Sequence, residues 1–113
     1  MIIKGRVYIS GKMSGMDEQQ SRAHFRVAEN ELAVHYGVPM ELIFNPWVLD
    51  YIMPGADYEE YMTVDMAILK TCSTIYMLNN WQDSPGAKRE HERAKELGLD
   101  IWYEQERTEQ CKR

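Results

Sequence analysis

The sequence predicts an α/β fold with three layers, in which helices cover both faces of a mostly parallel sheet of four to five strands. Two observations predict it. Short β-prone runs alternate with segments of helical periodicity, in the order strand, helix, strand, loop, helix, strand, helix, strand. Each of the first three runs is followed by a loop rich in glycine, proline, asparagine or serine. In such a fold these loops gather at the carboxyl ends of the strands, where ligands bind.

The first predicted strand covers residues 7–10 and leads into a loop, residues 11–15, that contains two glycines, a serine and a lysine. Such a loop brings backbone amides close to an anion, but it matches neither a Walker A nor a GxGxxG motif, and alone it is more often a turn. A helix is expected from residue 17 to about residue 36, where apolar residues recur at helical spacing before a glycine. These apolar residues are Phe25, Ala28, Leu32 and Tyr36.

The second predicted strand, residues 42–44, ends at Asn45-Pro46, because proline cannot continue a central ladder. The segment that follows, residues 47–61, is predicted to be irregular. It is dense in aromatic side chains, which are Trp47, Tyr51, Tyr58 and Tyr61. These rings would either stack on a base or sugar, or cover the sheet edge or a subunit interface. A second helix is expected over residues 59–70.

The third predicted strand, residues 74–78, leads to a helix that continues to about Leu97. Ser84 is placed as its N-cap, and Pro85 fits the first helical position, where its missing N–H costs nothing. A final strand is expected over residues 99–103. The complete order predicts a flavodoxin/Rossmann-like sheet.

Two carboxyl groups fall on the apolar, inward stripes of the second and third helices. Their apolar companions are Met62, Met66 and Leu69 for Asp65, and Ala87, Ala94 and Leu97 for Glu90. A carboxylate in such a place is either desolvated or faces a cleft, and a cleft is the better interpretation. Glu90 alone has simpler explanations, because an early glutamate complements the helix dipole or pairs with a nearby Lys88, Arg89 or Arg93. The second acid, Asp65, favours a shared site.

Composition and charge limit the class of function. At 113 residues the chain is predicted to be one domain, residues 1–104, followed by a polar tail, residues 105–113. A net charge of −5 disfavours a nucleic-acid polymer as partner, although one small anion can still be bound. No stretch is long enough to span a membrane and no signal peptide is recognised, so we expect a cytoplasmic protein.

Neither the cysteines nor the histidines indicate a metal ion or another cofactor. Cys72 and Cys111 lie far apart and fit no metal spacing, so free thiols in a reducing compartment are expected rather than a disulfide. His24 and His35 lie in the first helix without a neighbouring cluster of ligands, which indicates solvated or boundary positions.

The chain contains a set of short motifs and single residues in this order: Tyr8-Ile9-Ser10-Gly11-Lys12-Met13-Ser14-Gly15, Phe25, Asn45-Pro46, Tyr61-Met62, Asp65, Cys72, Trp81, Ser84-Pro85-Gly86-Ala87, Glu90, Ala94 and Gly98. The set, which covers about residues 6–103, resembles the DUF4406 family. That family groups small bacterial and phage proteins related to the nucleoside 2-deoxyribosyltransferases and the deoxynucleoside monophosphate N-glycosidases. No single motif is specific, but their order and spacing are.

The resemblance implies an enzyme that hydrolyses an N-glycosidic bond, or transfers deoxyribose, on a (deoxy)nucleoside or its 5′-monophosphate. Glu90 would be the nucleophile that forms a covalent glycosyl-enzyme. Asp65 would orient sugar hydroxyls or help to protonate the leaving base, and Tyr8 would lie near the nucleophile. The sugar or 5′-phosphate would be bound by residues at the strand ends, which are Ser10, Gly11, Lys12, Asn45, Trp81, Ser84 and Gly86.

The chain also departs from the family pattern. Lys12 stands where proline is usual, which would strengthen phosphate binding, and Ser73 stands where an aspartate is usual, which would fit a drifted or inactive site. Asn80 and Pro85 also replace commoner residues. An alternative function is therefore a non-catalytic protein that binds or sequesters a nucleotide, encoded by a phage and located in the host cytoplasm. A purely structural subunit is a weaker third hypothesis.

The expected partner is a small nucleoside or nucleotide, with no nucleic-acid polymer and no membrane. A homo-oligomer, a dimer or a tetramer, is also expected. Residues 47–61 are more apolar than the surface that a small monomer usually exposes, and the resemblance implies that a neighbouring copy completes the pocket.

Overall fold

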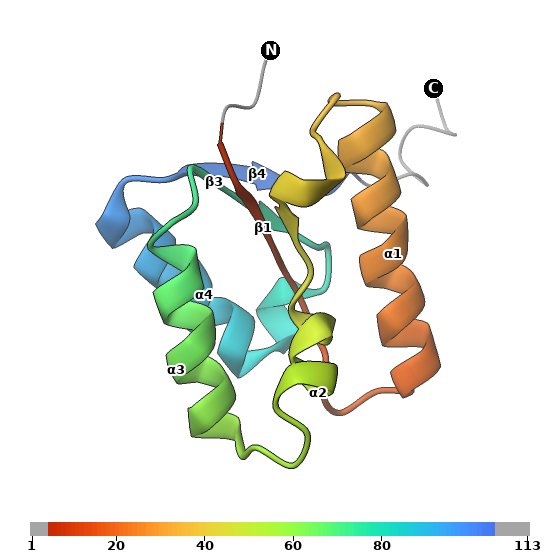
Figure 1. The fold of residues 1–113 in the computed structure, drawn as a ribbon, viewed down its shortest axis with the longest axis vertical. Coiled ribbons are helices and arrows are strands. Elements are labelled where there is room, and N and C mark those ends of the chain that lie inside the picture. The colour runs from red at the N-terminus through yellow and green to blue at the C-terminus, as the bar shows by residue number, and fades with distance from the viewer. Residues whose placement is uncertain (1–4, 106–113) are drawn as a thin grey trace.

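The computed structural model describes residues 5–105, which form a parallel four-stranded sheet between two layers of helices (Figure 1). The strands are β1 (Val7–Ser10), β2 (Ile43–Phe44), β3 (Thr74–Met77) and β4 (Asp100–Tyr103). They lie side by side in the order β2-β1-β3-β4, and every neighbouring pair is parallel. The predicted three-layer, Rossmann-like α/β fold is confirmed.

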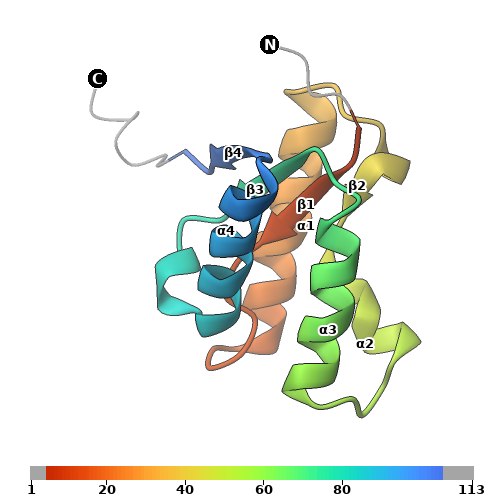
Figure 2. The same ribbon diagram turned by 90° about the vertical axis from the view of Figure 1, so that its left-hand side faces the viewer.

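The two faces of the sheet are covered by different helices (Figure 2). The helix α1 (Glu18–Val34) covers one face, and α3 (Tyr58–Leu69) and α4 (Pro85–Leu97) cover the other. Because side chains alternate along a strand, β1 serves both faces. Val7 and Ile9 pack against α1, whereas Tyr8 packs among residues of α3 and α4.

The three long helices begin at side chains that cap them. The Asp17 carboxylate accepts from the Gln20 N–H at the start of α1, and Asp57 and Glu60 form a capping box at the start of α3. Ser84 accepts from the Ala87 N–H at 3.1 Å, which makes it the N-cap of α4, as expected. The helix α4 ends at Gly98, which adopts a left-handed conformation with a φ of 75°.

The prediction that residues 47–61 are irregular is wrong at both ends of this segment and holds only for residues 53–57. A 3-10 turn, Pro46–Val48, begins directly after β2 and continues into a short helix, α2 (Leu49–Ile52). The reason lies in Asn45, whose side chain accepts from the Trp47 N–H at 3.0 Å. Asn45-Pro46 is thus a helix-starting pair of the same kind as the serine and proline at the start of α4, and not only the end of a strand.

The topology places a crevice at the carboxyl ends of β1 and β3. The chain passes from β1 outward to β2 and then returns to β3 on the other side of β1, so the strand order reverses there. The loops after β1 and β3 also touch closely. A side chain at Gly11 would begin 2.7 Å from an atom of Leu78, so only glycine fits at that position.

Two further expectations concern cysteines and membranes. Cys72 is buried and free, whereas Cys111 lies outside the described residues, as does all of the predicted tail except residue 105. Within residues 5–105, no helix is long and apolar enough to cross a membrane.

Candidate active site

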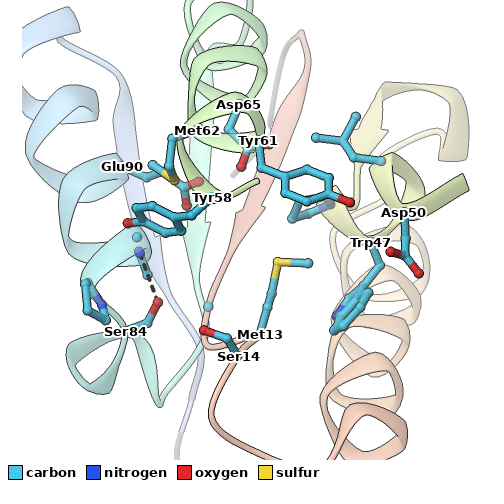
Figure 3. A pocket seen from close by; sticks show the side chains of 16 residues that line it. Met13, Ser14, Trp47, Asp50, Tyr58, Tyr61, Met62, Asp65, Ser84 and Glu90 are labelled. Carbon is cyan, nitrogen blue, oxygen red and sulfur yellow. Dashed lines mark hydrogen bonds between the residues drawn. The ribbon is translucent and has the colours of Figure 1, made fainter. Parts of the chain in front are cut away.

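A cavity of about 470 Å³ opens at the carboxyl ends of the strands (Figure 3). Its walls come from the loop after β1, from the segment that includes α2, and from the first turns of α3 and α4. The lining residues are Gly11, Met13, Ser14, Pro46, Trp47, Leu49, Asp50, Tyr58, Tyr61, Met62, Asp65, Ser84, Pro85, Gly86, Ala87 and Glu90. The volume lies in the range of pockets that bind small organic molecules.

Glu90 is held at the bottom of this cavity by two hydroxyl groups of β1. Tyr8 Oη donates to Glu90 Oε2 at 2.7 Å, and Ser10 Oγ donates to Glu90 Oε1 at 2.6 Å. The two donors are two residues apart on one strand, so they project from the same face of the sheet. Glu90 is only 6% exposed, and both of its carboxyl oxygens have a partner.

The simpler explanations of Glu90 do not describe its contacts. Its carboxyl oxygens accept hydrogen bonds from the two hydroxyls of β1 and not from a basic residue of its own helix. Arg89 pairs with Glu59 of α3 at 3.1 Å, and Arg93 pairs with Glu96 at 3.0 Å. The glutamate is therefore turned inward, as its place on the helical stripe predicted.

Asp65 faces the same cavity from α3 and is also 6% exposed. Its Oδ1 atom is buried and has no hydrogen-bond partner among the described residues. A buried carboxyl oxygen without a partner is costly, so a ligand that supplies a donor would stabilise this side chain. Figure 3 shows the Asp65 and Glu90 side chains converging on one end of the cavity.

Burial and mutual repulsion change the acidity of this pair. Burial raises the pKa of Glu90, and the negative charge of Asp65 raises it further, while the hydroxyl donors Ser10 and Tyr8 oppose the shift. Burial likewise raises the pKa of Asp65. Two carboxyl groups so placed resist losing both protons, so the pair retains one proton more readily than exposed carboxyls do. Burial also raises the pKa of Tyr8 well above its ordinary value, so Tyr8 stays a hydrogen-bond donor.

The structure brings together some of the predicted site residues. Glu90, Asp65, Tyr8 and Ser10 form one cluster, with Ser10 contacting the glutamate rather than lining the cavity. Gly11, Ser84 and Gly86 line the cavity. Ser10, Gly11, Ser84 and Gly86 belong to the strand ends and helix starts that the topology directs to one place, whereas Asp65 reaches the cluster from the second half of α3.

Three other predicted binding residues do not line the cavity. The Lys12 N–H donates to Asn80 Oδ1 at 3.1 Å, and the Asn45 amide donates to Glu29 Oε2 at 3.1 Å. Trp81 stacks on His91 with ring centroids 4.2 Å apart and packs against the core beside α4. Their predicted role in substrate binding stays a prediction.

Sequence reasoning assigned only part of the cavity walls and left two roles open for the aromatic residues of segment 47–61. Trp47, Tyr58 and Tyr61 line the cavity, whereas Tyr51 is 77% exposed, so the aromatic segment contributes both to the cavity and to the outer surface. Met62 lies one turn before Asp65 on the same stripe, and this spacing was the available signal for it. Met13 comes from a loop, where no periodicity marks it.

Residues 5–105 contain no group of three or more His, Cys, Asp or Glu side chains that would hold a metal ion. His24 lies 2.8 Å from Glu104 at the edge of the sheet, and the side chain of His35 is 66% exposed. Both are boundary or surface positions, as expected.

Comparison with known proteins identifies a family without a known activity. The family described as "Domain of unknown function (DUF4406)" matches residues 5–103. No curated protein matches the chain.

Proposed function

The chain belongs to the DUF4406 family, and from this premise we propose that it cleaves or transfers at the N-glycosidic bond of a nucleoside or its 5′-monophosphate. The observation that carries the proposal is the pair of buried carboxyl groups, Asp65 from α3 and Glu90 from α4, at one end of an apolar cavity. An oxocarbenium-like centre is stabilised by a nearby anion in a dry pocket, and a second carboxyl group manages the proton.

The hydrogen bonds favour a division of roles between the two acids. Glu90 accepts from two hydroxyls, and such donors stabilise a carboxylate. Asp65 has a buried oxygen without a partner, which favours its neutral form. Burial and the charge of Asp65 nevertheless raise the pKa of Glu90 to about 8, above that of Asp65, which burial raises to about 6, so the shared proton of the free pair lies on Glu90. In the reactive form this proton has passed to Asp65, which leaves the negative charge on Glu90.

The chemistry then proceeds in two balanced steps. In the first, a Glu90 oxygen forms a bond to C1′ while the bond between C1′ and the base nitrogen breaks, and Asp65 gives its proton to the departing base. In the second, water attacks C1′, Asp65 takes a proton from that water, and the bond between C1′ and Glu90 breaks. If a second base attacks instead of water, the result is deoxyribosyl transfer.

The walls of the cavity suit the rest of such a substrate. Aromatic rings from Trp47, Tyr58 and Tyr61, together with Met13 and Met62, offer flat and polarisable surfaces against which a base and a sugar can pack. This property supports binding whether or not a reaction follows.

A direct test incubates the protein with each common nucleoside and 5′-monophosphate and measures free base by chromatography. We expect base release by the wild-type protein and none above background by Glu90→Ala. A covalent intermediate is checked separately, by the intact mass of acid-quenched protein. If the two proteins release base equally slowly from every compound, the enzymatic proposal is wrong.

A second candidate function, binding without turnover, is favoured by one observation. Both oxygens of Glu90 already accept hydrogen bonds from β1, and the side chain is 6% exposed, so a ligand contacts the cavity walls more than the carboxylate. This candidate predicts saturable binding in a calorimeter, with the ligand recovered unchanged.

A further inference from the structure

We infer that the ligand of this cavity carries no phosphate, so that the substrate class is a nucleoside with an uncharged 5′ end and not a nucleoside 5′-monophosphate. The inference rests on the proposed function and narrows it. It comes from the charges that surround the cavity, and it differs from the expectation that Lys12 makes the site favour a nucleotide.

The charged side chains that line the cavity are all acidic. They are Asp50, Asp65 and Glu90, and none of the sixteen lining residues within the described chain is a lysine, arginine or histidine. A phosphate monoester carries up to two negative charges near neutral pH, and in a pocket of low dielectric each is repelled by a carboxylate more strongly than in water. A neutral nucleoside meets no such repulsion.

Arg22 and Arg89 contact side chains that line the cavity, and both are engaged by carboxylates. Arg22 contacts Glu18 at 2.9 Å and Asp50 at 2.6 Å, and its guanidinium lies 4.2 Å from the centre of the Trp47 ring. Arg89 contacts Glu59 at 3.1 Å. Recruiting either arginine to a phosphate would cost one of these contacts, and moving Arg22 would leave the Asp50 charge facing the cavity unpaired.

Lys12 lies between two lining residues in the sequence but does not itself line the cavity. Its backbone is fixed on both sides, because its N–H donates to Asn80 Oδ1 and its carbonyl accepts from Ser21 Oγ. The side chain runs along its own loop, with Cε only 3.6 Å from the point where a side chain at Gly15 would begin. The Lys12 side chain thus packs beside Gly15 and forms no part of the cavity wall.

The start of α4 offers few donors for a phosphate. Pro85 has no N–H, and the Ala87 N–H already donates to Ser84 Oγ. Only the Gly86 amide of the first turn is left for a ligand. One amide is a weak counterpart to three carboxyl groups, and it suits the single hydroxyl of a sugar.

The test compares each 2′-deoxynucleoside with its own 5′-monophosphate, by base release with the wild-type protein and by calorimetry with Glu90→Gln. We expect the nucleoside to be preferred by at least about tenfold in both measurements, a factor that corresponds to about 1.4 kcal/mol. A preference for the monophosphate, or its selective loss in Lys12→Met, would overturn the inference.

A charge-addition variant tests the cause. Ser14 lines the cavity and is exposed, so Ser14→Lys should raise affinity for the monophosphate relative to the nucleoside. Thr63→Lys adds the same charge on an exposed position of α3 that does not line the cavity, and it should leave the ratio unchanged. An equal change in both variants would contradict a local cause.

The outcomes separate this inference from the proposed function. If nucleosides bind better than monophosphates but no base is released, the enzymatic proposal fails and the inference stands. If base is released mainly from monophosphates, the function stands and the inference fails. If no compound binds or is cleaved, both are wrong.

Discussion

The two faces of the sheet are built from the same strands but differ in chemistry. On the α1 face, Val7 and Ile9 of β1 meet apolar residues of α1, and the packing is a continuous core. On the opposite face, Tyr8 and Ser10 of the same strand present hydroxyls to Glu90. Both faces bury apolar side chains, but the α3/α4 face also buries two acids, at a cost in stability.

The largest effect is expected from a substitution on the α3/α4 face, which carries the proposed reaction. Glu90→Ala removes the proposed nucleophile, and it should lower kcat for base release by about 10⁴-fold or more. The measurement is steady-state base release, with circular dichroism to establish that the variant is folded. If base release is retained within tenfold, Glu90 is not the nucleophile.

Ile9→Ala should produce the reverse pattern, because it acts on the α1 face. Ile9 is fully buried, and its truncation should lower the free energy of unfolding by about 2–5 kcal/mol. Urea denaturation measures this loss, and base release per folded molecule should change little. A small loss in stability with a large loss in activity would show that the two faces are not separate in function.

Ser10→Ala tests the neighbouring position on the other face. Losing a donor to the Glu90 carboxylate should raise the pKa of that carboxyl and lower kcat/KM by about 10- to 100-fold at neutral pH. The acidic limb of the pH profile should move to higher pH, because the carboxylate form is needed. Ser10→Thr keeps the hydroxyl and should restore most of the activity, whereas equal effects of both variants would indicate a packing defect.

Asp65→Asn should stabilise the fold while it impairs the proposed chemistry. The folded state raises the pKa of Asp65, so it binds more protons than the unfolded state, and stability falls as pH rises from about 4 through the raised pKa. At neutral pH the variant should gain about 1–2 kcal/mol, since one pKa unit is worth about 1.4 kcal/mol. Urea denaturation at pH 4 and pH 8 checks that the gain appears only at the higher pH.

The smallest effect concerns the end of α4, remote from the cavity. Gly98 has a φ of 75° and open space around it, so Gly98→Ala costs only backbone strain, about 1 kcal/mol. Thermal unfolding should show a decrease in Tm of roughly 4–8 °C. Base release by the folded variant should match the wild type, and a changed KM would mean that α4 transmits strain to the first turn.

Much of this arrangement could be predicted from the sequence, because it depends on local signals. The inward direction of Asp65 and Glu90 follows from helical periodicity, and the start of α4 follows from Ser84 and Pro85. The same signal at Asn45 was interpreted only as the end of a strand, and α2 was missed for that reason.

Contacts between different helices, strands and loops could not be predicted from the spacing of residues along the chain. Nothing in the spacing of β1 shows that Ser10 meets Glu90, eighty residues away, instead of a ligand. Likewise, Lys12 lies between two lining residues in the sequence, but the direction of a loop side chain depends on backbone contacts with Asn80 and Ser21. Such details need tertiary structure.

The alternation of β1 has one more consequence, for the fidelity of folding. A slip of that strand by a single residue would turn both hydroxyls toward α1 and push valine and isoleucine beneath the acids. The apolar packing against α1 and the hydrogen bonds to Glu90 would then be lost together. Once β1 has the register that packs the core correctly, Tyr8 and Ser10 are therefore also in position to contact Glu90. No separate segment is needed to place them.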